Sequence, residues 1–155
     1  MMILNDLEYQ TTKERVAGFQ RALVMLNQPN NEIKSKNHWL WQSNIDGLHQ
    51  LIAEFNEQIQ DYEKLISRDK NEPLIFEVNS IEELPLILIK VRIVAGITQK
   101  ELAEKLGVSE VQMQRFEEWE YQEATLSKLL EASRVLGISI QNKITLEVSS
   151  ITKVA

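Results

Sequence analysis

Few residues in this sequence have the types and spacing that catalysis or metal binding requires. The chain has no cysteine, which excludes disulfides, thiolate zinc sites and cysteine nucleophiles. His38 and His49 are the only histidines, and nothing around them supports a metal site or a catalytic dyad. The five glycines are isolated, so there is no phosphate-binding glycine loop, and no serine or lysine lies in a nucleophile motif. The sequence therefore predicts no catalytic residue, no metal and no cofactor, and a protein that is not an enzyme.

The first region, residues 1–70, has the hydrophobic periodicity of two helices. Thr11 and Glu14 fit a capping box at a helix start. Apolar residues follow at spacings of three and four, namely Val16, Phe19, Leu23 and Leu26. Pro29 ends this helix, and a second begins near Asn37. Its apolar residues form a heptad seam: Ile45, Leu48, Ile52, Phe55, Ile59, Tyr62 and Ile66.

We expect these two helices to form an accessory hairpin. The coiled-coil-like seam is then either the core of the hairpin or a surface that binds a second chain. Trp39 and Trp41 alternate rather than share a helical face, so one of them could be open to a partner and both could also be buried.

A charged linker, residues 67–72, separates the hairpin from a second domain at 73–149. Two segments of this domain alternate apolar and polar residues, 74–78 and 144–148, and they could pair into a small two-stranded β element. Between them, helix start and stop signals follow closely on one another. They are Pro85, Gly96, Thr98 with Glu101, Ser109 with Gln112, Thr125 and Gly137. The predicted fold is mainly α, with a bundle of four to five short helices after the hairpin.

Residues 99–116 have the pattern of two helices that cross steeply over a tight turn. Ala103 is small enough for the second helix to cross close above it, and Gly107 supplies the turn. The remaining interior positions are apolar: Leu102, Leu106, Val108, Met113 and Phe116. These residue types occur where a helix-turn-helix requires them.

The segment Gly96-Ile97-Thr98-Gln99-Lys100-Glu101-Leu102-Ala103-Glu104-Lys105-Leu106-Gly107-Val108-Ser109 resembles the phage-repressor and Cro family, also called Xre. Gln114-Arg115-Phe116-Glu117 and the stretch from Leu129 to Ile138 extend the match to about a third of the chain. The hairpin before this domain is similar to that of stand-alone regulators and of HigA-like antitoxins.

The resemblance implies a recognition helix, residues 109–118, that lies in the major groove of double-stranded DNA. Its base-contacting residues would be Ser109, Glu110, Val111, Gln114 and Arg115. By the same match, the phosphate-binding residues would be Thr98, Gln99, Lys100 and Gln112.

The charge balance departs from what a DNA-binding surface usually has. The chain carries a net charge of −6, and residues 81–137 hold ten acidic and seven basic side chains. Because carboxylates oppose phosphate binding, we expect weak non-specific affinity and a dependence on homodimers. The sequence thus favours a cytoplasmic Xre-type regulator of transcription that binds an inverted repeat as a homodimer. The alternative is an antitoxin that neutralises a partner toxin and regulates its own operon.

Overall fold

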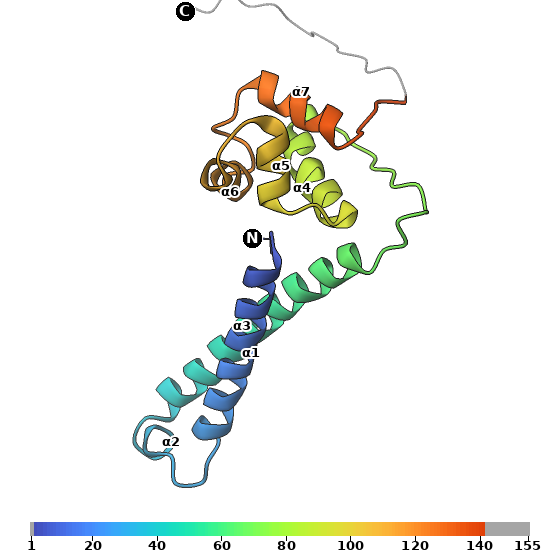
Figure 1. Cartoon of the computed structure of the whole chain (residues 1–155). Helices are drawn as coiled ribbons and strands as arrows, with labels where there is room; N and C mark the ends of the chain where they lie inside the picture. Colours follow the sequence, from blue (N-terminus) through green and yellow to red (C-terminus); the bar gives the residue numbers. More distant parts are fainter. Residues whose placement is uncertain (1, 142–155) are drawn as a thin grey trace, which may run out of the picture.

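The computed structural model describes residues 2–141, and all regular secondary structure in this range is helical (Figure 1). The predicted mainly α fold is confirmed. In chain order the elements are α1 (Asp6–Leu26), α2 (Glu32–Lys36), α3 (His38–Ile66), the 3-10 turn η1 (Ile81–Glu83), α4 (Leu84–Ala95), α5 (Gln99–Leu106), α6 (Glu110–Glu118) and α7 (Leu126–Val135). No helix of the described residues is long and apolar enough to cross a membrane.

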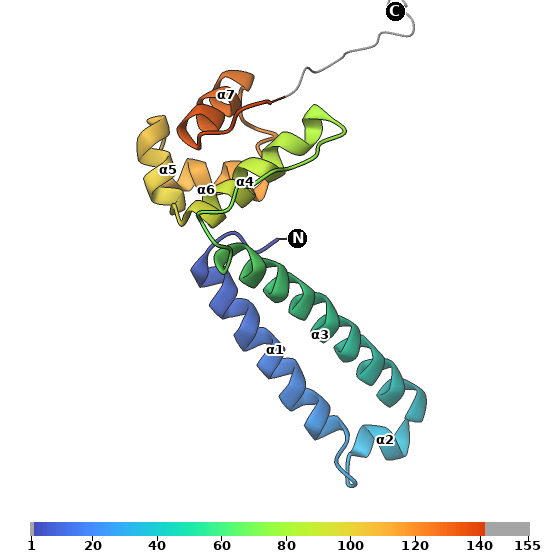
Figure 2. The same cartoon turned by 90° about the vertical axis from the view of Figure 1, so that its right-hand side faces the viewer.

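The antiparallel helices α1 and α3 form a long hairpin, with α2 in the connection at its far end (Figures 1 and 2). The predicted start of α1 is wrong, because the side chain of Asn5 rather than Thr11 accepts the capping hydrogen bond, from Glu8 N at 2.9 Å. Glu8 bonds back to the Leu4 amide at 2.9 Å, so Asn5 and Glu8 satisfy the first orphan amides. The start of α3 agrees with the prediction, since Asn37 accepts from Leu40 N at 3.0 Å.

The predicted strand at 74–78 is wrong: residues 73–78 form no regular secondary structure. The expected alternation is present only in part, because Leu74 and Phe76 are half-buried and Ile75 is 75% exposed, but Val78 is 52% exposed as well. A strand also needs a hydrogen-bonded neighbour, and residues 2–141 contain no segment paired with this one. The second predicted strand, 144–148, lies outside the described residues.

Helices α4 to α7 form a compact bundle whose ends follow the signals in the sequence. Pro85 lies in the first turn of α4, and Gly96 and Gly107 end α4 and α5 with φ of 70° and 63°. Thr98 and Glu101 form the complete predicted capping box of α5. The hydrogen bonds from Thr98 hold the pKa of the Glu101 carboxyl below its usual value.

The core of the bundle continues into the base of the hairpin. Its most deeply buried apolar side chains come from α4, α5, α6 and α7, namely Leu88, Ile89, Leu102, Ala103, Leu106, Met113 and Ala132. Ile3, just before α1, is only 2% exposed, and Tyr62 near the end of α3 is 4% exposed in the same cluster. The chain start is therefore packed between the two parts of the molecule (Figures 1 and 2).

The turn between α6 and α7 contains two consecutive residues with positive φ, Glu120 at 47° and Tyr121 at 58°. This left-handed conformation is costly for a residue with a Cβ atom. The Tyr121 side chain compensates by packing, since it is 2% exposed and stacks on Phe116 with ring centroids 5.9 Å apart. Glu120 is exposed and has no comparable contact to offset its conformation.

We expect Glu120→Gly to raise the free energy of unfolding by about 1 kcal/mol, because glycine adopts positive φ without a Cβ clash. Urea denaturation followed by circular dichroism measures this change. Gln122→Gly is the matched control, since Gln122 is exposed in the same turn and its φ is not positive. That control should lower the stability slightly. A loss of stability in Glu120→Gly would contradict the assignment of strain to this turn.

Candidate nucleic-acid interface

Helices α5 and α6 meet over the tight turn at Gly107. The Val108 amide donates to the Ala103 carbonyl at 3.0 Å, which closes the turn against the end of α5. Ala103 is 1% exposed, and Val108 is half-buried at the corner. Met113 and Phe116 are buried on the inner side of α6, at 0% and 6% exposure. Packing of these side chains fixes α6 against α5.

The outer side of α6 is free of intramolecular packing. Glu110, Val111, Gln114 and Arg115 are exposed, with Val111 at 67%. Ser109 is the N-cap of α6, and its hydroxyl accepts from Gln112 N at 3.2 Å. This hydroxyl is therefore already engaged in capping the helix. The candidate base-contacting side chains therefore lie together on one exposed helix face.

Arg115 already has an acidic partner in the same chain. Its Nη2 atom lies 2.8 Å from Oε2 of Glu123, in the turn that follows α6. The two side chains are 59% and 51% exposed, so solvent weakens this ion pair. The pair holds Arg115 near the end of α6 and competes with any phosphate or base for the guanidinium.

The candidate phosphate-binding residues fall into two groups. Thr98, Lys100 and Gln112 are exposed at the starts of α5 and α6. Gln99 is only 6% exposed, and both ends of its amide are engaged. Its Nε2 donates to Glu117 Oε2 at 2.8 Å, and its Oε1 accepts from Asn5 Nδ2 at 3.1 Å. Its side chain thus joins the bundle to the start of α1.

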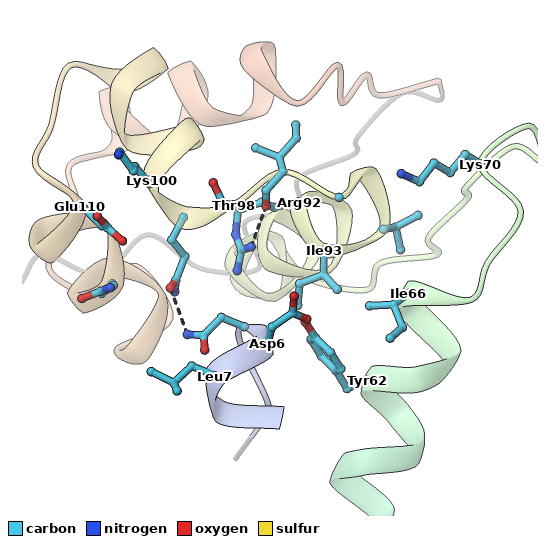
Figure 3. A pocket seen from close by; sticks show the side chains of 16 residues that line it. Asp6, Leu7, Tyr62, Ile66, Lys70, Arg92, Ile93, Thr98, Lys100 and Glu110 are labelled. Atoms are coloured by element: carbon cyan, nitrogen blue, oxygen red, sulfur yellow. Dashed lines mark hydrogen bonds between the residues drawn. The ribbon is translucent and has the colours of Figure 1, made fainter. Parts of the chain in front are cut away.

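A buried ion pair lies behind α6 and is the polar centre of the molecule. Nε and Nη2 of Arg92 each lie 2.5 Å from the Glu117 carboxylate, and the two side chains are 3% and 0% exposed. Arg92 also donates to the Ile97 carbonyl at 2.9 Å (Figure 3). It donates to the Leu4 carbonyl at 2.7 Å as well. Burial raises the pKa of the Glu117 carboxyl, while Arg92 and Gln99 lower it in part.

Sequence reasoning missed this network. The sequence analysis gave Arg92 no role and named Glu117 only within the segment that extends the family match, whereas the structure buries both side chains. The available signal was a charged residue at a core position of each helix, since Arg92 follows Leu88 by four residues and Glu117 follows Met113 by four.

A cleft of about 520 Å³ is lined by the starts of α1, α5 and α6 together with the ends of α3 and α4 (Figure 3). Five of the candidate DNA-contacting residues line it: Thr98, Gln99, Lys100, Glu110 and Gln114. Asp6 also lines it and accepts from the Tyr62 hydroxyl at 2.9 Å. Among residues 2–141, no group of three or more His, Asp or Glu side chains is placed to hold a metal ion.

Comparison with known proteins agrees with this geometry. Residues 88–142 match a family model described as helix-turn-helix, which covers α5, α6, α7 and most of α4. No curated protein and no solved structure matches the chain. The match leaves the hairpin outside, so the similarity to HigA-like antitoxins stays a prediction.

We expect Arg92→Met to lower the free energy of unfolding by roughly 3–5 kcal/mol, because it leaves the Glu117 carboxylate buried without its partner. Chemical denaturation measures the change. Arg92→Met combined with Glu117→Met should recover part of the loss, since no charge then remains buried. Arg134→Met in α7, an exposed position, is the control and should change stability little. Equal losses in the single and double variants would refute a coupled pair.

Proposed function

Because residues 88–142 form a helix-turn-helix domain of the Xre/Cro type, we propose that the protein is a sequence-specific DNA-binding regulator of transcription that binds an inverted repeat as a homodimer. The observation that carries this proposal is the exposed outer side of α6, with polar side chains that intramolecular packing leaves accessible. Such a regulator would act where its DNA is, and we place it in the cytoplasm.

The chemistry of these side chains suits the major groove. Gln114 can pair with the N6 and N7 atoms of adenine, and Arg115 with the O6 and N7 atoms of guanine or with a phosphate. Glu110 can accept from the amino group of cytosine, and Val111 can contact the methyl group of thymine. Ser109 lies at the start of the helix, where its hydroxyl can contact a base edge as donor or acceptor.

The phosphate contacts would come from the starts of α5 and α6. Thr98, Lys100 and Gln112 are exposed and supply side chains, and the first amides of α5 supply backbone donors. Gln99 contributes differently from the original expectation, because its side chain is held by Glu117 and Asn5. We assign the Gln99 side chain the role of fixing the first turn of α5, so that only the backbone N–H of Gln99 would face a phosphate.

The acidic balance explains why two copies are needed. Glu110, Glu118, Glu120 and Glu123 are exposed on or after α6, and each reduces attraction to the duplex. A single domain with this surface would bind weakly. Two copies joined by a two-fold axis would contact half-sites about 34 Å apart and add their binding free energies.

A second candidate function, neutralisation of a partner toxin, has one supporting observation. The far end of the hairpin exposes apolar side chains from three helices, namely Val24, Met25, Ile33, Trp39 and Leu40. Trp39 is 76% exposed, while Trp41 is half-buried and donates to the Leu26 carbonyl at 2.8 Å. The DNA contacts proposed above do not use this end. Co-purification with the product of the neighbouring gene tests it, and Trp39→Ser should abolish that complex.

The DNA-binding proposal predicts that the full-length protein binds DNA from upstream of its own gene, with an affinity that falls as salt rises. Arg115→Ala should weaken specific binding about tenfold or more, since a good base contact contributes roughly 1–3 kcal/mol. Fluorescence anisotropy measures both effects. Arg134→Ala, a charge removed from α7, is the matched control. No salt-sensitive binding by the wild-type protein would refute the proposal.

The ion pair between Arg115 and Glu123 gives a prediction of opposite sign. Glu123→Gln should tighten DNA binding several-fold, because it releases Arg115 and removes a carboxylate from beside the duplex. The same titrations measure the change. Glu131→Gln is the control, since Glu131 pairs with Lys128 on α7 at 2.8 Å. An unchanged affinity in Glu123→Gln would place Arg115 away from the DNA.

A further inference from the structure

Residues 3–7, which we call the α1 strap, dock the start of α1 on the helix-turn-helix domain. The Leu4 carbonyl accepts from Arg92 Nη2 at 2.7 Å. Asn5 caps α1 with its side-chain oxygen, while its Nδ2 atom donates to Gln99 Oε1 at 3.1 Å. One side chain therefore both begins α1 and binds the first residue of α5. The strap lies outside the segment that matches the family model.

The strap is held on its other side by the end of α3. Ile3 is 2% exposed in the same core cluster as Tyr62, and the Tyr62 hydroxyl donates to Asp6 at 2.9 Å. The strap is thus held by one deeply buried side chain and a few hydrogen bonds, and no ion pair joins it to the rest of the described chain. Because single hydrogen bonds add little net stability, lifting the strap costs less than unfolding the bundle.

The docked strap covers the place where a DNA phosphate is expected. Gln99 is only 6% exposed, and Asn5 occupies its amide oxygen. Leu7 is 78% exposed and lines the same cleft as Lys100 and Gln114. In Figure 3 the start of α1, with Leu7, lies across this cleft from Lys100. A DNA backbone that approached the start of α5 would therefore enter the cleft and meet the Leu7 side chain.

The strap also brings a carboxylate to this place. Asp6 is exposed and lines the cleft, and within residues 2–141 it forms no salt bridge. Lys100 likewise forms none in the described part of the chain, so its ammonium group remains available to a phosphate. The Asp6 carboxylate repels the same phosphate. The docked strap thus opposes DNA by its shape and by its charge.

We propose that the α1 strap is an autoinhibitory contact, which must lift from the start of α5 before DNA binds there with full affinity. The apparent affinity is then the intrinsic affinity multiplied by the fraction of molecules whose strap is lifted. A substitution or a partner that loosens the base of the hairpin raises this fraction and tightens DNA binding. The inference rests on the proposed function, and it gives the hairpin a role in regulating how strongly the domain binds DNA.

The test measures DNA binding by full-length variants that loosen the strap without changing its charge. Asn5→Ser keeps a hydroxyl that caps α1 but is too short to bond to Gln99. It should tighten binding about threefold to tenfold, the factor expected for one part-buried hydrogen bond. Fluorescence anisotropy with a duplex from upstream of the gene measures the dissociation constant. Asn37→Ser is the matched control, since Asn37 caps α3 at the far end of the hairpin, and it should bind DNA as the wild type does.

Tyr62→Phe is a second variant, which acts on the other side of the strap. It removes the hydroxyl that bonds to Asp6 and leaves the ring in the core, so it should also tighten DNA binding. Tyr9→Phe is its matched control, because the Tyr9 hydroxyl donates to Glu63 at 2.6 Å and neither of these residues lines the cleft. Circular dichroism should show unchanged helicity in all four variants.

Hydrogen exchange followed by mass spectrometry reports on the strap directly. When the duplex is added to the wild type, the peptide that contains residues 3–9 should exchange faster, while α5 and α6 exchange more slowly. A strap that bound DNA slows or leaves unchanged overturns the inference, as does an Asn5→Ser protein that binds DNA no more tightly than the wild type. In both cases DNA binding is observed, so the proposed function stands. If neither the wild type nor the strap variants bind DNA, the proposed function fails and the inference fails with it.

Discussion

The buried ion pair between Arg92 and Glu117 is the interaction on which the arrangement of the molecule depends. Four separate segments meet at these two side chains. Arg92 is on α4, Glu117 is on α6, Gln99 of α5 bonds to the carboxylate, and the Leu4 carbonyl before α1 bonds to the guanidinium. Apolar packing alone would let α6 slide along its neighbours, whereas this network is satisfied in one arrangement. The orientation of α6 thus follows from a polar constraint inside an apolar core.

A buried ion pair is a poor source of net stability, because removing two charges from water costs nearly as much as their attraction returns. Its advantage here is geometric. A bidentate guanidinium and carboxylate accept little rotation, and the remaining donors of Arg92 are used by the Ile97 and Leu4 carbonyls. The network therefore also links the hairpin to the bundle, since Asn5 caps α1 and bonds to Gln99. The hairpin is held by the same group of side chains that fixes α6.

The sequence predicted most of the bundle because its signals are local. Gly96, Gly107 and Thr98 set helix ends through their own backbone preferences, and heptad spacing marked α3. The strand at 74–78 failed because a strand depends on a neighbour distant in sequence. The start of α1 failed because Asn5 and Thr11 are both adequate caps, and the docking of Ile3 and Leu4 onto the bundle decides between them. The roles of Gln99 and Glu117 depend on a contact across 18 residues, which helical periodicity does not encode.

The link between hairpin and bundle sets the angle at which these two parts of the molecule meet. The contacts that fix this angle are the Asn5 to Gln99 hydrogen bond, the Leu4 carbonyl on Arg92 and the burial of Ile3. Asn5, Gln99 and Arg92, which make these contacts, line the same cleft as Lys100, Glu110 and Gln114 (Figure 3). The side chains that hold this angle are thus neighbours of those proposed to contact DNA. A substitution in one group should therefore shift the positions of side chains in the other.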